Sequence, residues 1–165
     1  MPPIALFQKI SLKQFELDYP DFLPHENIKT AYNSIRLPER ATVGSAGYDF
    51  FTYFPIHFSG LNREIIIPTG LRAKIDTGWV LSIFPRSGLG FKYGLALSNT
   101  VGIIDSDYFF ADNEGHIKIK LKADKKDFRI EPGAAFCQGI FLPFGITKDD
   151  NAAGIRTGGF GSTTL

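Results

Sequence analysis

Cysteine and surplus charge are both nearly missing from this sequence. Cys137 is the single cysteine in 165 residues, which excludes an intrachain disulfide framework and a zinc site built from cysteines. A reducing, cytoplasmic setting is the simplest interpretation, and we expect the thiol to be buried and inert. The 18 basic and 17 acidic residues give a formal net charge of only +1. This balance lacks the electrostatic signature of a nucleic-acid binder, so any anionic ligand must be bound by a local cluster of residues.

Long hydrophobic runs are missing too. No apolar stretch approaches the roughly 20 residues of a membrane-spanning helix. The N-terminal sequence MPPIALFQKISLKQFELDYPDF does not have the charged, apolar and small-residue regions of a signal peptide. We therefore expect no association with membranes. A chain of this length buries roughly 70% of its unfolded surface as one domain, so a single core suffices.

Short apolar runs between turn residues predict an all-β sandwich or barrel. From Thr30 onwards, Gly, Pro and Asn recur about every 8 to 12 residues, which is typical of such folds. In HIKIKLK at 116–122, apolar and basic residues alternate, so Ile117, Ile119 and Leu121 share one face and the three lysines share the other. We expect the lysines to be solvated. The expected strands are 47–53, 63–67, 70–76, 79–84, 95–98, 116–122 and 136–142.

The two ends differ from this pattern, and they divide the chain into 1–30, 31–150 and 151–165. In the first part, Ser11 and Gln14 form a possible capping box for a short helix that Pro20 and Pro24 end. The last part, NAAGIRTGGFGSTTL, is rich in glycine, so we expect it to be mobile until a ligand holds it. The histidines have no ligand spacing and are expected on the surface or in loops: His25, His57 and His116.

Four short motifs carry the functional signal. Each has an ordinary explanation alone, as the start of a strand, a turn or a solvated loop. The motifs are SAGYDF (45–50), PRSGLG (85–90), NTVGIIDSDY (99–108) and RTGGFGST (156–163). In this order and spacing they resemble the motifs of the trimeric dUTPase family, over about residues 35–165. The resemblance implies a distorted, jelly-roll-like β-barrel, a flexible C-terminal lid and hydrolysis of dUTP to dUMP and pyrophosphate.

The resemblance assigns the general base to Asp105, the first aspartate of IIDSD. A carboxylate suits this role because it can accept a proton from an attacking water. The competing interpretation makes Asp105 a turn residue that bonds its own backbone. Asp107 is expected to be structural and to cap the same turn.

The resemblance places base and sugar recognition in the same segment. An extended hairpin over 99–104, with Asn99, Gly102 and Ile104, would offer backbone N–H and C=O groups to the edge of uracil, and Gly102 would allow close approach. Tyr108 resembles the family tyrosine whose ring excludes a 2′-hydroxyl. A tight pocket would reject the 5-methyl group of thymine.

Phosphate binding falls to two other motifs. Ser87, with Arg86 and Gly88 beside it, resembles the serine that donates to the α and β phosphates, and Gln138 is expected to order phosphate or metal-bound water. A magnesium ion is expected to bridge the phosphates, because it prefers oxygen ligands and retains several waters. We expect no direct protein ligand for it, with Asp49 at most an indirect one through water.

The tail would close over the bound nucleotide. Phe160 would stack on uracil and Arg156 would pair with the γ-phosphate, with Gly161 and Ser162 in the same binding segment. Many family members have one more residue between the arginine and Gly-Gly-Phe, so the path of Arg156 differs from theirs. The resemblance also implies a homotrimer in which three chains build each site.

Two further departures concern the fourth motif and a loop. GAAFCQGIF keeps Gln138 but has Ala135 where the family usually has arginine. The segment 109–115 is about four residues longer than the usual family turn, as in a Gram-positive bacterial or phage subgroup, and we expect its Asp112 and Glu114 to be solvated. This loop and the segment 1–30 are where a regulatory protein partner would bind.

Two other functions compete with dUTP hydrolysis. A dCTP deaminase shares the fold but needs a catalytic glutamate near the base, and none accompanies GIIDSDY. A non-catalytic β module that binds a protein partner would not need Ser87, Asp105, Tyr108 and Phe160 together. Both remain alternatives to be tested.

Overall fold

The fold is built from short antiparallel strands in several small sheets. The computed structural model describes residues 2–60, 63–124, 127–154 and 156–159. The largest sheet has the order β2 (Glu39–Arg40), β3 (Tyr48–Phe51), β12 (Ala135–Pro143), β7 (Trp79–Pro85) and β9 (Gly102–Ile104). The others pair β5 (Glu64–Pro68), β10 (Lys118–Lys122) and β8 (Ala96–Leu97), β1 (Ala5–Lys9) with β6 (Leu71–Ile75), and β4 (Ile56–Phe58) with β11 (Phe128–Ile130).

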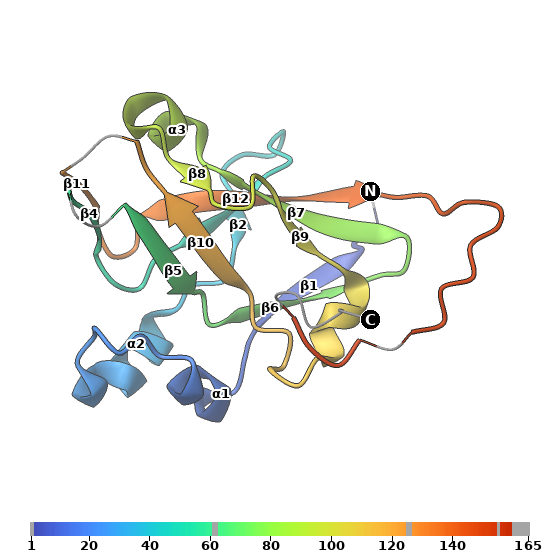
Figure 1. Cartoon of the computed structure of the whole chain (residues 1–165), viewed down its shortest axis with the longest axis horizontal. Helices are drawn as coiled ribbons and strands as arrows, with labels where there is room; N and C mark the ends of the chain where they lie inside the picture. Colours follow the sequence, from blue (N-terminus) through green and yellow to red (C-terminus); the bar gives the residue numbers. More distant parts are fainter. Residues whose placement is uncertain (1, 61–62, 125–126, 155, 160–165) are drawn as a thin grey trace.

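Helices are few and lie outside the sheets (Figure 1). They are α1 (Leu12–Leu17), α2 (Ile28–Ser34) and α3 (Ser87–Tyr93), with 3₁₀ turns η1 (His25–Asn27) and η2 (Ser106–Phe110). None of the helices in the described part of the chain is long and apolar enough to cross a membrane. The predicted all-β, jelly-roll-like fold is confirmed, and each of the seven expected strands is present within a few residues of its predicted position.

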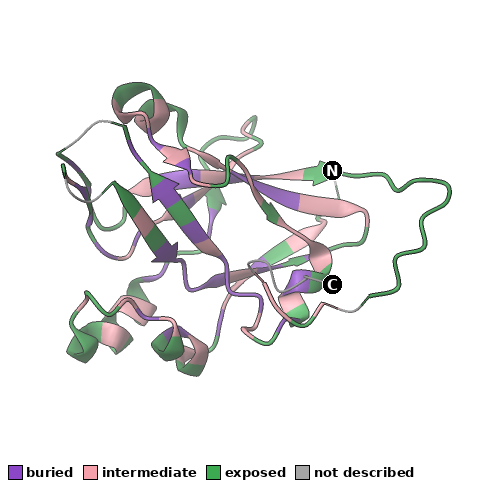
Figure 2. Ribbon diagram, in the orientation of Figure 1, coloured by how far each residue is buried: buried purple, intermediate pink, exposed green. Residues whose placement is uncertain are grey.

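One hydrophobic core lies between the sheets (Figure 2). Phe50 of β3, Leu81 of β7 and Phe136 of β12 are completely buried where the three neighbouring strands meet. The thiol of Cys137 is buried there as well, and burial raises its pKa. The prediction of a buried thiol is therefore confirmed.

The N-terminal segment contains more structure than the single predicted helix. Ser11 caps α1 as predicted, because its Oγ accepts the Gln14 N–H at 3.1 Å. The preceding residues form β1, which pairs antiparallel with β6 so that Phe7 lies opposite Ala73. The boundary expected after residue 30 falls inside α2.

His116 lies in a loop, as predicted, but it is not on the surface. Its side chain is completely buried; Nδ1 lies 2.6 Å from the Asp18 carboxylate, and Nε2 accepts the Gly70 N–H at 2.8 Å. Strand β10 begins only at Lys118, so the alternation of the strand does not extend to His116. His25 and His57 are exposed as predicted.

The lysine face of β10 is only partly solvated. Lys120 and Lys122 are exposed, as predicted. Lys118 is half-buried, however, and its Nζ lies 2.5 Å from Asp18. The expectation of a solvated Lys118 is corrected, because the N-terminal segment brings a carboxylate against this face.

Candidate active site

The 99–104 hairpin forms one wall of a cavity of about 300 Å³. Thr100 turns the chain with a φ of 70°, and its N–H donates to the Leu97 carbonyl at 3.1 Å. The lining is mostly apolar and includes three of the predicted base-binding residues: Asn99, Gly102 and Ile104. The hairpin predicted from the third motif therefore exists and borders a cavity of ligand size.

Asp105 lies directly after β9, where η2 begins. Its backbone is extended (φ −78°, ψ 158°), and its side chain makes no capping hydrogen bond to η2. The carboxylate contacts Arg156 instead, at 2.5 Å from Nη2. The structure thus gives no support to the interpretation of Asp105 as a self-bonded turn residue.

Asp107 contributes to the same charged cluster. The Arg156 Nε donates to its carboxylate at 2.9 Å, and the Asp107 side chain is half-exposed. The structure shows no capping hydrogen bond from the Asp107 side chain within the described residues. The expected capping role is therefore replaced by an ion pair, which reaches a residue far along the chain.

Tyr108 is held inside the molecule by its hydroxyl group. The side chain is buried, its Oη donates to the His116 carbonyl at 2.8 Å, and it accepts from Asn113 Nδ2 at 2.8 Å. Burial raises the pKa of Tyr108. The hydroxyl is thus neutral near pH 7 and satisfied both as donor and as acceptor.

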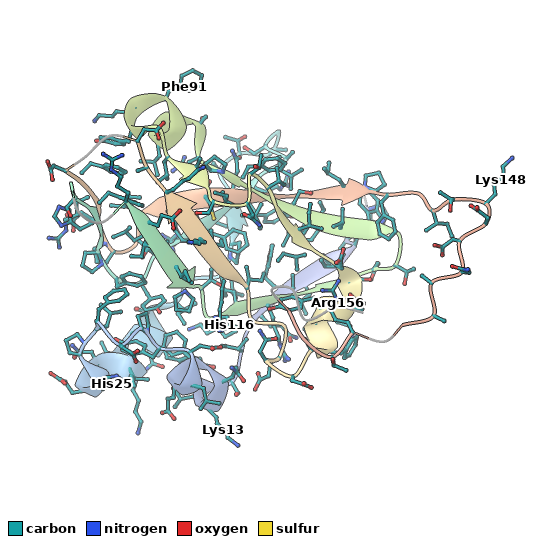
Figure 3. All side chains as sticks on the ribbon, viewed as in Figure 1. Lys13, His25, Phe91, His116, Lys148 and Arg156 are labelled. Carbon is teal, nitrogen blue, oxygen red and sulfur yellow. The ribbon has the colours of Figure 1, made fainter. Side chains whose placement is uncertain are left out.

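The described part of the lid segment lies over η2. Besides the Arg156 ion pairs, the Thr157 carbonyl accepts the Asp112 N–H at 3.1 Å. Gly159 lies against the Tyr108 ring, where an added Cβ would come within 2.6 Å of Cε2. Figure 3 shows Arg156 beside this turn. Phe160, Gly161 and Ser162, which were predicted to bind substrate, lie outside the described residues.

The predicted phosphate-binding residues form a second cluster. Arg86 precedes α3, and its Nε lies 3.5 Å from the Asp49 carboxylate. Gln138 of β12 lies opposite Asp49 in the sheet, and its Nε2 donates to the Pro85 carbonyl at 3.5 Å. Strands β3, β12 and β7 therefore bring Asp49, Gln138 and Arg86 together.

Ser87 and Gly88 are helical, although a turn was expected. They begin α3, and the first hydrogen bonds of that helix run from the Leu89 and Gly90 N–H groups to the Arg86 carbonyl. A Cβ on Gly88 would meet no atom within 4 Å, so its surroundings are open. Both residues thus present their backbone in an accessible first turn.

One chain does not bring the two clusters together. In Figure 1, α3 lies at one side of the molecule and η2 at another. Figure 3 shows the same separation between Phe91 of α3 and Arg156 beside η2. The start of α3, which carries the residues predicted to bind the α and β phosphates, therefore lies away from the predicted base within a single chain, whereas Arg156 lies beside that base.

Sequence reasoning missed two contacts of the enlarged loop. Asn113 bonds the Tyr108 hydroxyl, and Glu114 accepts both the N–H and the Oγ–H of Ser11, at 2.8 and 2.5 Å. The expectation that Glu114 is merely solvated is corrected, whereas Asp112 is exposed as expected. No local pattern signals these contacts, because their partners belong to other segments.

Comparison with known proteins gives a consistent result. Residues 33–164 match the sequence model of the dUTPase family. The chain is 41% identical over 133 residues to the deoxyuridine 5′-triphosphate nucleotidohydrolase of Lactococcus lactis, with 78% of this chain and 88% of that protein covered. It is 39% identical over 139 residues to the corresponding protein of Tolumonas auensis, with coverages of 79% and 89%.

Solved structures show the same similarity. The crystal structure of dUTPase from Streptococcus mutans matches with a TM-score of 0.64 and 33% identity, covering 86% of this chain and 98% of that one. The dUTPase of Staphylococcus bacteriophage 80alpha also has a TM-score of 0.64, over 98% of both chains. Its identity is only 19%, so this second likeness concerns the fold alone.

Proposed function

Because this chain belongs to the dUTPase family, we propose that it hydrolyses dUTP to dUMP and pyrophosphate. This reaction keeps uracil out of DNA and supplies dUMP for thymidylate synthesis. The observation that carries the proposal is the position of Asp105, which directly follows the last strand of the cavity-forming hairpin and uses its carboxylate for no local bond. Comparison with known proteins does not favour the alternative of dCTP deamination.

Asp105 acts as the general base. Its carboxylate accepts a proton from the water that attacks the triphosphate, and the bond between the α and β phosphates breaks. A positioned base of this kind typically contributes about 10²- to 10⁴-fold to the rate. The ion pair with Arg156 holds the orientation of the carboxylate until substrate enters.

The hairpin and Tyr108 select the nucleoside. Uracil occupies the cavity beside Asn99, Gly102 and Ile104, where backbone N–H and C=O groups form hydrogen bonds with the edge of the base. The Tyr108 ring lies under the deoxyribose and leaves no room for a 2′-hydroxyl. Because the ring is anchored through its hydroxyl, it cannot easily move aside for a ribonucleotide.

The second cluster binds the phosphates. Ser87, the accessible backbone at Gly88, and Arg86 neutralise and orient the α and β phosphates, while Gln138 orders a water molecule. Arg156 exchanges its two carboxylates for the γ-phosphate, and Phe160 stacks on uracil within a lid that includes Gly161 and Ser162. Closure of this lid excludes bulk water from the reaction.

Magnesium is the proposed cofactor. No group of three His, Cys, Asp or Glu side chains within the described ranges could hold a metal ion. Asp49 is a half-buried carboxylate beside the phosphate-binding residues, so it fits an indirect contact through a metal-bound water. When bound, magnesium would neutralise charge on the phosphate oxygens.

A homotrimer with shared sites would unite the two clusters. The separation of α3 from η2 supports this, because catalysis needs the phosphates beside Asp105 (Figure 1). Residues 144–154 form an exposed arm that leads away from β12, and such an arm could carry the lid to a neighbouring chain. A regulatory protein partner and a cytoplasmic location stay predictions.

The direct test measures pyrophosphate release from dUTP, dCTP, dTTP and UTP, with and without magnesium. We expect turnover of dUTP alone and a loss of about 10²- to 10⁴-fold in Asp105→Asn, which should still bind substrate. Asp107→Asn is the matched control, because it changes the neighbouring carboxylate that also pairs with Arg156. Ammonia release from dCTP, or equal turnover of dTTP, would contradict the proposal.

A further inference from the structure

The enlarged loop that follows η2 supports the side chain of Tyr108. Residues 111–115 return the chain against this side chain, and Asn113 Nδ2 lies 2.8 Å from its Oη. The other partner of that hydroxyl is the main-chain carbonyl of His116, also at 2.8 Å. Asn113 is therefore the side chain that contacts this hydroxyl within the described structure.

The direction of both hydrogen bonds follows from the chemistry of the groups. A carbonyl only accepts, so the single phenolic proton goes to His116 and the Tyr108 oxygen must accept from Asn113. The amide oxygen of Asn113 faces the other way and accepts the Gly115 N–H at 3.2 Å. This second bond fixes which end of the amide points to Tyr108.

The loop itself is held in place by contacts on both sides. Glu114 bonds Ser11, at the start of α1, and its own N–H donates to the Ala111 carbonyl at 2.8 Å. At Gly115, φ is 70°, and a Cβ there would come within 2.6 Å of the Tyr108 carbonyl oxygen. The loop is thus packed closely against the main chain of Tyr108, and Asn113 has little freedom to move.

We propose that Asn113 is a positioning residue that sets the discrimination between deoxyribose and ribose by holding the Tyr108 ring. This inference rests on the proposed dUTP hydrolysis. Steric exclusion of a 2′-hydroxyl depends on a ring that cannot yield, and the ring of Tyr108 is tied at the hydroxyl end by Asn113 and His116. Without the Asn113 amide, the Tyr108 hydroxyl keeps only its hydrogen bond to His116. The ring can then move, and ribonucleotides gain access to the site.

The test compares kcat/KM for UTP and dUTP in Asn113→Leu, which has similar volume but no hydrogen-bonding group. We expect the UTP/dUTP ratio to rise about two- to tenfold, the effect of one lost hydrogen bond. Asp112→Asn is the matched control, since its exposed side chain belongs to the same loop, and its ratio should stay unchanged.

Tyr108→Phe removes this hydrogen bond and also the one to the His116 carbonyl. We expect it to raise the ratio at least as much, and Asn113→Leu should add nothing further in that background. A purely structural role for Asn113 would lower thermal stability without changing the ratio, and that result would overturn the inference. Equal effects of Asn113→Leu in both backgrounds would overturn it too. Absence of pyrophosphate release by the unmodified protein would instead refute dUTP hydrolysis itself.

Discussion

The guanidinium group of Arg156 joins the carboxylates of Asp105 and Asp107. Its Nη2 lies 2.5 Å from Asp105 and its Nε lies 2.9 Å from Asp107, and the arginine side chain is only 22% exposed. A planar guanidinium can donate from two nitrogens to two carboxylates at once, whereas a lysine has only one side-chain nitrogen. The lid residue proposed for the γ-phosphate is therefore paired with the proposed base.

Substitution of Arg156 should reduce catalysis more than folding. We expect Arg156→Ala to lower kcat/KM for dUTP by about 10- to 100-fold, because charge-assisted hydrogen bonds are lost. Arg156→Lys should recover only part of the lost kcat/KM, since lysine restores the positive charge but not the planar set of N–H donors of the guanidinium group. Arg129→Ala is the control: Arg129 is exposed and paired with Glu131, so steady-state pyrophosphate release should not change. Unchanged activity in Arg156→Ala would refute the lid role.

A methyl group at Gly102 should obstruct the base cavity. A Cβ at this position would lie 3.1 Å from the Ile83 Cβ and 3.5 Å from Leu97, and all three residues line the cavity. We expect Gly102→Ala to raise KM for dUTP roughly tenfold, as overpacking of this kind costs on the order of 1 to 3 kcal/mol. Ile103→Val, at the exposed position next in the strand, should leave KM unchanged. Equal KM values for the two variants would place the uracil elsewhere.

Stability should fall at mildly acidic pH because of His116. Burial lowers the pKa of His116, although the Asp18 carboxylate opposes that shift. The folded state thus binds this proton less readily than the unfolded state. Above about pH 6.5 both states are neutral, and below it the free energy of unfolding decreases as the pH falls. The acceptance of the Gly70 N–H by Nε2 agrees with a neutral ring.

Asp18 should extend the same trend to lower pH. Burial opposes ionisation, but hydrogen bonds from His116, Lys118 and Gln14 outweigh it and hold the pKa of Asp18 below its ordinary value. The contribution of the ionised Asp18 to the free energy of unfolding is therefore present above about pH 4 and lost below that value.

The role of His116 can be tested by substitution. Thermal denaturation of His116→Gln should show a smaller loss of stability between about pH 7 and pH 5 than the unmodified protein. His25→Gln, at an exposed site, should retain the full dependence; identical curves for all three proteins would exclude His116 as the source.

Magnesium should bind together with the nucleotide. Because the described residues provide no cluster of metal ligands, calorimetry should detect magnesium binding in the presence of a non-hydrolysable dUTP analogue and little without it. Asp49→Asn should weaken magnesium binding in the presence of the analogue only modestly. Strong binding without nucleotide would point to ligands other than the phosphates.

Local patterns predicted the elements that depend on local contacts. The alternation in 116–122 identified β10, and the Ser11 cap identified α1, since both depend on neighbours within a few residues. These two features need no knowledge of distant partners. The hairpin that borders the cavity was instead expected from the resemblance of the third motif to that of the dUTPase family.

Most of the missed features depend on pairing across the chain. Strand β1 exists because Phe7 and its neighbours pair with β6, and His116 is buried because α1 supplies Asp18 as its partner. The segment beginning at Ser87 looks like a turn from its glycines, yet it forms a helix that ends at Gly94 in a left-handed conformation. The Arg156 ion pairs and the Asn113 contact carry no signal in the sequence, because nothing local specifies them.

The burial of Cys137 has a practical consequence for observing the lid. The thiol is completely inaccessible and its pKa is raised, so the folded protein offers no reactive native sulfur to maleimide or iodoacetamide reagents. A cysteine introduced in the exposed arm, for example Thr147→Cys, would therefore be the only site labelled. A fluorophore there would report lid movement directly during turnover, without prior removal of a cysteine from the core.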